Sequence, residues 1–175
     1  MRFCSNMSGV VLAIALTVAN VSANGTTLVN TSGECKQALS HAKSSAVFLT
    51  ANDSVFVRLV EDSLGICLAN AGLTVTNRET LEKKLGEQVN QRQKESSGTT
   101  INALEIGKSV QADVIVTGTA VVLQEEKRPM VQMVSFQLLD VRSEKTLISV
   151  VFDYEQPLPI STACEEFVKL VTQAR

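Results

Sequence analysis

Two runs of residues decide the fold of this chain: Leu73-Thr-Val-Thr-Asn-Arg-Glu-Thr-Leu-Glu-Lys-Lys-Leu-Gly-Glu-Gln88 and Ala112-Asp-Val-Ile-Val-Thr-Gly-Thr-Ala-Val-Val-Leu123. The first predicts a short strand that leads into a helix, because Asn77 can cap a helix whose apolar residues return at helical spacing. The second opens with continuous apolar residues, a pattern typical of a strand in the middle of a sheet covered on both faces. Gly118 interrupts this second run and predicts a bend or bulge.

A long amphipathic helix is predicted over residues 54–70, just before the first run. Its apolar residues fall at the three-four spacing of one helical face, which we expect to be buried. Asp53 or Ser54 can cap its start, and Gly72 can end it. Residues 46–49 form a short candidate strand ahead of it. The apolar residues of the helix are Phe56, Leu59, Val60, Leu64, Cys67, Leu68 and Ala71.

The remainder of the chain predicts one more short helix, two strands and a last helix. The short helix is expected over residues 101–110, and the strands over 130–141 and 147–154. Thr162 and Glu165 have the spacing of a capping box for the last helix. The order is therefore β-α-β-α-α-β-β-β-α. We predict an α/β protein with a single layered domain, whose mixed sheet has about five strands and includes an antiparallel meander.

The amino-terminal residues predict export. Residues 1–23 have a basic start at Arg2, a short apolar run and small residues before Asn24, which is typical of a signal peptide. Cys4 precedes the apolar run, so no cysteine stands where a lipid anchor would be attached. We therefore expect an exported protein that is not lipid-anchored, periplasmic in a bacterium, with no transmembrane segment after signal removal. Residues 24–45 predict a flexible leader and a short helix, and residues 46–175 the α/β domain.

Three cysteines follow the predicted signal peptide, and in an oxidising compartment two of them can pair. All three pairings are open from the sequence. Cys67 lies on the apolar stripe of the predicted helix, where a buried free thiol is the expected state. We therefore favour a disulfide between Cys35 and Cys164.

The composition argues against several classes of function. A formal net charge of −2, without a cluster of basic residues, is not the pattern of a nucleic-acid-binding protein. The only histidine, His41, lies on a short polar segment without a nucleophile motif nearby, and we interpret it as a solvated surface residue. The sequence contains no motif for a phosphate cradle, a metal site or a dinucleotide. We predict no catalytic residues, no cofactor and no metal.

Three segments resemble one family of bacterial envelope proteins. Val75–Gln88 is similar to the start of a helix in the curli-secretion family, CsgG. Ile101–Thr119, which contains Gly107-Lys108 and Ala112-Asp113, is similar to a second segment of that family. Leu139–Leu147 resembles the family's turn between two strands. The wider group includes LpoB, FlgO and the amino-terminal domain of TolB. The resemblance covers roughly residues 46–175 and implies a protein that acts by binding other proteins.

The chain departs from the curli channel in two respects. Its turns at 124–128 and 142–145 are too tight for membrane-crossing hairpins, and the lipid-bearing cysteine is missing. We expect a non-enzymatic factor that assembles or regulates an envelope machine, for secretion, flagella or cell-wall synthesis, through an envelope protein partner or as a homo-oligomer. A secreted surface- or host-directed binding protein and an enzyme with an unrecognised site stay open. The candidate recognition surface comprises Arg78, Glu79, Glu87 and Gln88.

Overall fold

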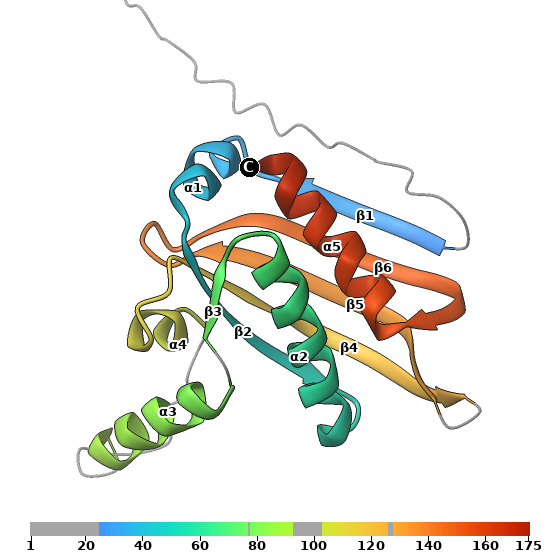
Figure 1. Ribbon diagram of the computed structural model, residues 1–175, viewed down its shortest axis with the longest axis horizontal. Helices are drawn as coiled ribbons and strands as arrows, with labels where there is room; N and C mark the ends of the chain where they lie inside the picture. Colours follow the sequence, from blue (N-terminus) through green and yellow to red (C-terminus); the bar gives the residue numbers. More distant parts are fainter. Residues whose placement is uncertain (1–24, 77, 93–102, 126–127) are drawn as a thin grey trace, which may run out of the picture.

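The computed structural model of the protein describes residues 25–76, 78–92, 103–125 and 128–175 (Figure 1). The predicted signal peptide and the helix cap at Asn77 lie outside these residues. The strands are β1 (Gly25–Thr31), β2 (Ser44–Ala51), β3 (Thr74–Thr76), β4 (Val114–Glu125), β5 (Arg128–Asp140) and β6 (Lys145–Pro159). The helices are α1 (Cys35–His41), α2 (Ser54–Asn70), α3 (Arg78–Arg92), α4 (Ala103–Ser109) and α5 (Ile160–Ala174). From β2 onward this is the predicted order.

All six strands form one mixed sheet in the order β1-β6-β5-β4-β2-β3. Strand β2 runs parallel to both β3 and β4, and β4, β5 and β6 form the predicted antiparallel meander. The sheet has one strand more than expected, because β1 pairs antiparallel with β6 from Gly25↔Tyr154 to Thr31↔Ile148. The prediction of a flexible leader is wrong for this segment. Its Asn and Gly residues suggested a loop, but its Thr and Val residues suit a strand that has a partner.

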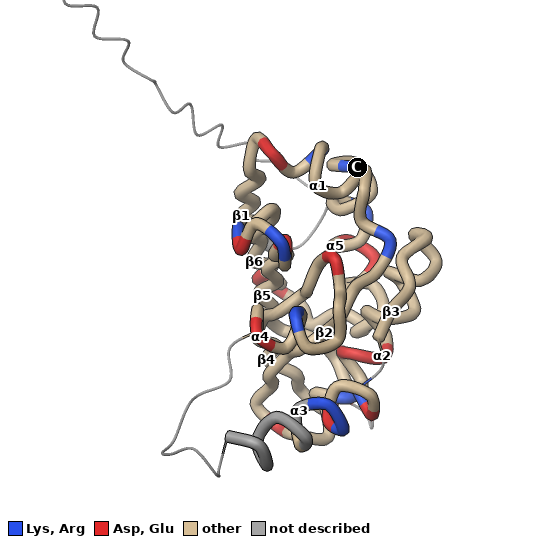
Figure 2. The backbone as a smooth tube through the Cα atoms, turned by 90° about the vertical axis from the view of Figure 1, so that its left-hand side faces the viewer, with Lys and Arg blue, Asp and Glu red and all other residues tan. Residues whose placement is uncertain are grey.

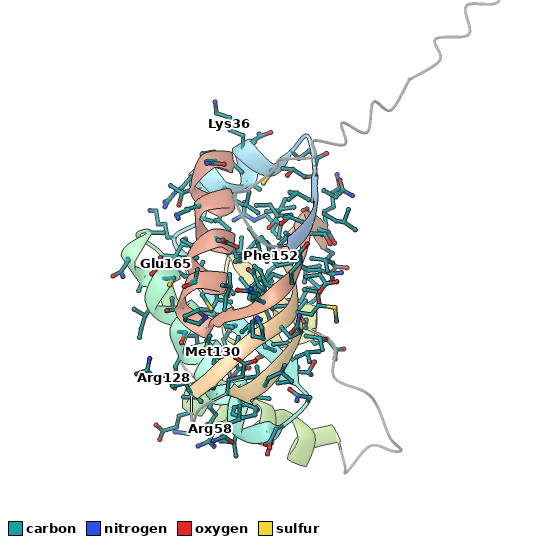
Figure 3. The ribbon with its side chains drawn as sticks, turned by 90° about the vertical axis from the view of Figure 1, so that its right-hand side faces the viewer. Lys36, Arg58, Arg128, Met130, Phe152 and Glu165 are labelled. Carbon is teal, nitrogen blue, oxygen red and sulfur yellow. The ribbon has the colours of Figure 1, made fainter. Side chains whose placement is uncertain are left out.

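The main core lies between one face of the sheet and helices α1, α2 and α5. Figure 3 shows α5 beside the strands, with Phe152 of β6 turned toward it. Three aromatic rings hold this layer together: the ring centroids of Phe136 and Phe167 are 4.7 Å apart, and those of Phe136 and Phe152 are 6.5 Å apart. Such aromatic contacts add to the stabilisation from burial itself.

A smaller core lies on the other face, where α3 and α4 cover the β2–β4 side of the sheet. Leu81 of α3 and Ile106 of α4 pack there against Ala46 and Ile115. Strand β4 is thus covered on both faces, as its apolar run predicted. Among the described residues, the β5, β6 and β1 part of this face has no covering element and carries exposed Gln137, Asp153 and Leu28.

Helix α2 begins and ends as predicted. Asp53 caps it by accepting a hydrogen bond from the N–H of Val55 at 2.9 Å, and Gly72 follows it with a φ of +86°. Val60, Leu64 and Leu68 are buried, as expected. Leu59 is not: 42% of it is exposed, because it lies at the edge of the buried stripe.

Three local predictions are corrected. The irregularity in the β4–β5 pairing falls between Val121 and Val122, where the extra residue is Gln132 of β5, and not at Gly118. Gly118 is required for another reason, since a Cβ there would lie 1.9 Å from the carbonyl oxygen of Ser135 on β5. Helix α5 begins at Ile160 after Pro159, without a side-chain cap, so the predicted capping box does not form. Strand β6 also continues to Pro159 instead of breaking earlier.

Candidate functional site

A buried carboxylate stands at the β3 edge of the sheet. Strand β3 pairs with residues 44–46 of β2, so no described strand lies beside the outer edge of β2 from Val47 onward. Glu61, projecting from α2, fills part of this gap. Its Oε1 accepts a hydrogen bond from the backbone N–H of Leu49 at 2.8 Å, and Glu61 is only 5% exposed. The side chain therefore satisfies a backbone donor that a neighbouring strand would otherwise bind.

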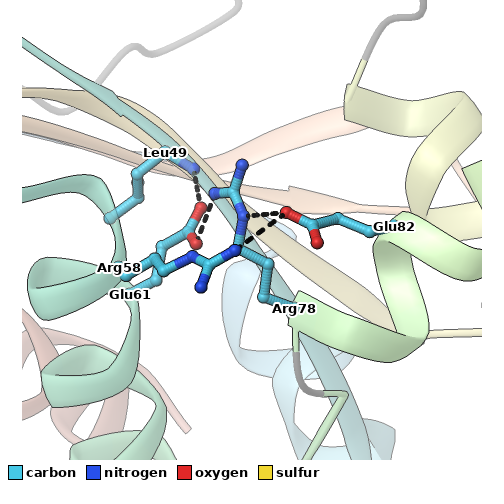
Figure 4. A network of polar contacts seen from close by, with 5 residues as sticks. All are labelled: Leu49, Arg58, Glu61, Arg78 and Glu82. Carbon is cyan, nitrogen blue, oxygen red and sulfur yellow. Dashed lines mark hydrogen bonds and ion pairs between the residues drawn. The ribbon is translucent and has the colours of Figure 1, made fainter. Parts of the chain in front are cut away.

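Arg78 compensates the charge of Glu61. Its Nη1 donates to Glu61 Oε2 at 2.6 Å, and its Nε donates to Glu82 Oε1 at 2.7 Å (Figure 4). Arg58 approaches the same oxygen of Glu82 at 4.0 Å. The hydrogen bonds to Glu61 and then Glu82 raise the pKa of Arg78, and the hydrogen bond from Arg78 lowers the pKa of Glu82. This network connects α2, β2 and the start of α3.

A groove of about 470 Å³ runs beside the network. Its walls come from β2, α2, β3 and the start of α3. The lining combines charged and apolar groups, so a ligand here would be held by contacts of both kinds. The residues that line the groove include Val47, Glu61, Gly65, Ile66, Val75 and Arg78.

Helix α2 also carries an exposed apolar stripe next to this groove. Val55, Leu59 and Ile66 are 66%, 42% and 63% exposed. Their spacing of four and then seven residues places them on one side of the helix. Ile66 also lines the groove, so the stripe and the groove are continuous. We call the three residues together with the groove the α2 surface.

The predicted recognition residues divide into three cases. Arg78 donates hydrogen bonds to Glu61 and Glu82, so its guanidinium has a structural role. Glu79 is exposed at the start of α3, a helix that carries both basic and acidic positions (Figure 2). The side chains of Glu87 and Gln88 lie outside the described part of the chain. Recognition by this helix stays a prediction.

The α2 surface was missed from the sequence because the helix was assigned a single apolar face. Its apolar residues in fact exceed what one face can bury, and Val55 and Ile66 lie off the predicted stripe. That excess was the available signal. Glu61 gave no comparable signal, because its partners Leu49 and Arg78 are distant in the sequence.

A second groove, of about 620 Å³, contains His41. It lies between α1, the end of α4 and the β5–β6 turn. Asp113 on its wall accepts hydrogen bonds through Oδ2 from the N–H of Lys43 and from the N–H and hydroxyl of Ser44, each at 2.9 Å. The hydrogen bond from Lys43, together with the two from Ser44, lowers the pKa of Asp113. Asp113 therefore joins the starts of β2 and β4, a structural role.

No described group has the surroundings of an activated nucleophile or a metal ligand cluster. Burial raises the pKa of the Cys35 thiol to about 11, and burial, with smaller contributions from Cys67 and Glu165, raises that of Cys164 to about 12. Such thiols stay protonated near neutral pH and are poor nucleophiles. Within the described ranges, no three His, Cys, Asp or Glu residues are grouped to hold a metal ion.

The structure does not support the predicted disulfide between Cys35 and Cys164, since both are free thiols. Cys164 faces α2, with its Sγ 3.9 Å from the carbonyl oxygen of Val60. Helix α1 lies instead beside the far end of α5, where Arg175 donates to the carbonyl of Ala42 at 3.3 Å. The packing of α5 on α2 thus turns Cys164 away from Cys35.

The comparisons with known proteins establish the fold. No family model and no curated protein matches the chain. A variant of the PelC dodecamer from Paraburkholderia phytofirmans has 15% identity and a TM-score of 0.51, covering 86% of this chain and 99% of its own. The LpoB carboxy-terminal domain from Salmonella enterica has 20% identity and a TM-score of 0.45, covering 70% of this chain and 96% of its own.

TolB from Acinetobacter baumannii has 16% identity and a TM-score of 0.42, covering 86% of this chain and 31% of its own. Identities this low show a likeness in fold alone, and of these three structures the PelC variant has a TM-score above 0.5. The finer resemblance to CsgG and FlgO stays a prediction. Among the described helices, none has the length and apolar character needed to cross a membrane. The chain is thus similar to PelC in fold.

Proposed function

We propose that this protein is a non-enzymatic, exported factor of the bacterial envelope that binds another protein through the α2 surface. The observation that carries the proposal is the exposed row of Val55, Leu59 and Ile66 beside the groove. Single exposed apolar residues are common on proteins, but an apolar patch rimmed by charged groups is typical of a protein-binding site. The charged rim is supplied by Arg58 and Asp62.

Three further points support the proposal. The buried thiols of Cys35 and Cys164 have raised pKa values and are poor nucleophiles near neutral pH. The signal-peptide pattern of residues 1–23 supports export, and the fold likeness to PelC, solved as a dodecamer, is compatible with assembly into a homo-oligomer. Glu79, exposed next to Arg78, would extend the binding surface onto α3.

Site-specific photo-crosslinking in intact envelopes tests the proposal. A photoreactive residue in place of Ile66 should capture one defined envelope protein, identified by mass spectrometry. Leu123, which is 38% exposed on a different surface, is the matched control position and should capture nothing comparable. A second variant, Leu59→Asp, should weaken the adduct formed at position 66 at least tenfold while the melting temperature is retained.

Two results would overturn the proposal. One is equal capture of the same proteins from positions 66 and 123. The other is a catalytic turnover that survives Leu59→Asp and is abolished by substitutions in the groove of His41.

A further inference from the structure

The outer edge of β1 is bare, in contrast to the edge that Glu61 closes. Strand β1 is the first in the order of the sheet, and its outer side pairs with no described residue (Figure 1). Its sequence, Gly-Thr-Thr-Leu-Val-Asn-Thr, contains no charge and no proline, and its pairing with β6 contains no bulge. Edge strands are usually protected by one of these devices, because free N–H and C=O groups recruit other strands.

The register of β1 on β6 determines which of its backbone groups face outward. Ser32 donates its N–H to the carbonyl of Leu147 at 2.9 Å, which continues the pairing of Thr31 with Ile148. Hydrogen-bonded and non-hydrogen-bonded pairs alternate along an antiparallel ladder. The N–H and C=O of Leu28 therefore face β6, and those of Thr27 and Val29 face outward.

Leu28 is 60% exposed, the largest apolar exposure on the strand. It projects from the sheet face that the helices of the main core do not cover, since Val29, its neighbour, packs against that core. Single exposed apolar residues are common, but Leu28 lies at the middle of an edge strand whose outward backbone groups pair with no described residue. A partner that pairs with the edge would cover it.

We infer that β1 pairs antiparallel with β1 of a second copy of this chain, about a two-fold axis at Leu28. In this register Thr27 faces Val29 of the other copy, and Gly25 faces Thr31. Four pairs of outward-facing residues would form about eight hydrogen bonds, two at each pair. The two Leu28 residues form the central non-hydrogen-bonded pair, where side chains are closest, with Cα atoms about 4.5 Å apart.

A second copy fits this edge better than a charged or proline-rich partner does. The strand is uncharged along its length, so an antiparallel copy places no like charges opposite one another. A two-fold arrangement also brings the exposed Leu28 against its own equivalent, which is the self-complementarity that such dimers require. The two six-stranded sheets would then be continuous.

Oxidative crosslinking of the full exported chain tests this pairing. Leu28→Cys should form a covalent dimer, because the Cα separation at the axis suits a disulfide. Asn30→Cys is the matched control, also exposed on the strand but offset from its own equivalent by roughly 14 Å along the strands. We expect at least tenfold more crosslinked dimer from Leu28→Cys, with the linkage at position 28 confirmed by mass spectrometry.

A backbone variant provides the second test. Thr27→Pro removes an outward N–H without removing a bond to β6, so the chain should keep its circular dichroism spectrum but sediment as a monomer. Thr27→Val keeps that N–H and should sediment as the unsubstituted dimer does. Equal crosslinking of the two cysteine variants, a monomer at high protein concentration, or a crosslink from position 28 to a different protein would overturn the inference.

The inference is independent of the proposed function, because the two use different surfaces. Capture from position 66 in the envelope tests the α2 surface, and crosslinking at position 28 tests the β1 edge in the purified protein.

Discussion

The two edges of the sheet are built in opposite ways. At the β3 edge, the short strand leaves part of β2 uncovered, and Glu61 with Arg78 occupies the gap. At the β1 edge, seven uncharged residues leave their outer backbone groups unpaired by any described residue. Among the described residues, side chains therefore protect the edge at β3, and no such protection is present at β1.

The closed edge depends on two side chains from different elements. Glu61 is buried, which would be unfavourable for an isolated charge by several kcal/mol. The hydrogen bond from Leu49 and the ion pair with Arg78 offset this penalty. A hydrophobic side chain could fill the same space, but it would leave the N–H of Leu49 without a partner. No described side chain plays a comparable role at the β1 edge, where we infer that a second copy of the chain pairs instead.

The largest expected effect lies between the two edges, at Gly118. Gly118→Ala would place a Cβ 1.9 Å from the carbonyl oxygen of Ser135, and backbone cannot move aside as a side chain can. We expect a loss of about 3 kcal/mol or more in the free energy of unfolding, measured by urea denaturation. Gly86→Ala, where nothing lies within 4 Å of the added Cβ, should cause no loss. A stable Gly118→Ala protein would show that β4 and β5 can separate.

The closed edge should be the next most sensitive. Arg78→Ala leaves the buried Glu61 carboxylate without its counter-charge, and we expect the free energy of unfolding to fall by about 2 kcal/mol, because Arg78 is itself partly exposed. Glu79→Ala, at the neighbouring exposed position, should change it by less than about 0.5 kcal/mol. Equal effects of the two variants would mean that the network does not stabilise this edge.

Acid should weaken the same network. The hydrogen bond from Arg78 lowers the pKa of Glu82 below its ordinary value of 4.5. Because the folded protein binds this proton less strongly than the unfolded chain, the contribution is present above pH 4.5 and is lost as the pH falls through the lowered pKa. Side-chain NMR titration should show the pKa of Glu82 rising toward 4.5 in Arg78→Ala. An unchanged pKa would exclude Arg78 as the cause.

The smallest effect on stability is expected at the bare edge. Leu28→Lys alters a largely exposed side chain, so the free energy of unfolding of the monomer should change by less than about 0.5 kcal/mol. The same change places two ammonium groups near the two-fold axis and should abolish dimerisation in sedimentation experiments. A large loss of stability in the monomer would show that Leu28 already packs within its own chain.

Much of the fold follows from local patterns. The apolar spacing predicted α2, Asp53 and Gly72 predicted its two ends, and the apolar run from Val114 predicted the central strand. These predictions succeed because helix and strand periodicity reflect which side of an element is buried. Strand β1 was missed because its Asn and Gly residues are typical of loops, and only its pairing with β6 makes it a strand.

The candidate sites were less predictable than the fold. Arg78 was noticed in a charged run, but its role required the position of Glu61, which precedes it by seventeen residues and lies on another helix. The favoured disulfide failed for a similar reason, since the direction in which Cys164 faces depends on the packing of α5 against α2. Which side chains meet, when they are distant in the sequence, depends on how the helices and strands pack, and the sequence pattern of one segment does not contain that information.

The α/β class, the order of the elements and the central place of β4 could be predicted from the sequence, because each follows from the period of the apolar residues along one segment. The state of the two edges follows from the assembled sheet: Glu61 and Arg78 close one, and no described residue pairs with the other. Whether a strand lies at an edge depends on which other strands pair with it. That property belongs to the assembled sheet and to no single segment.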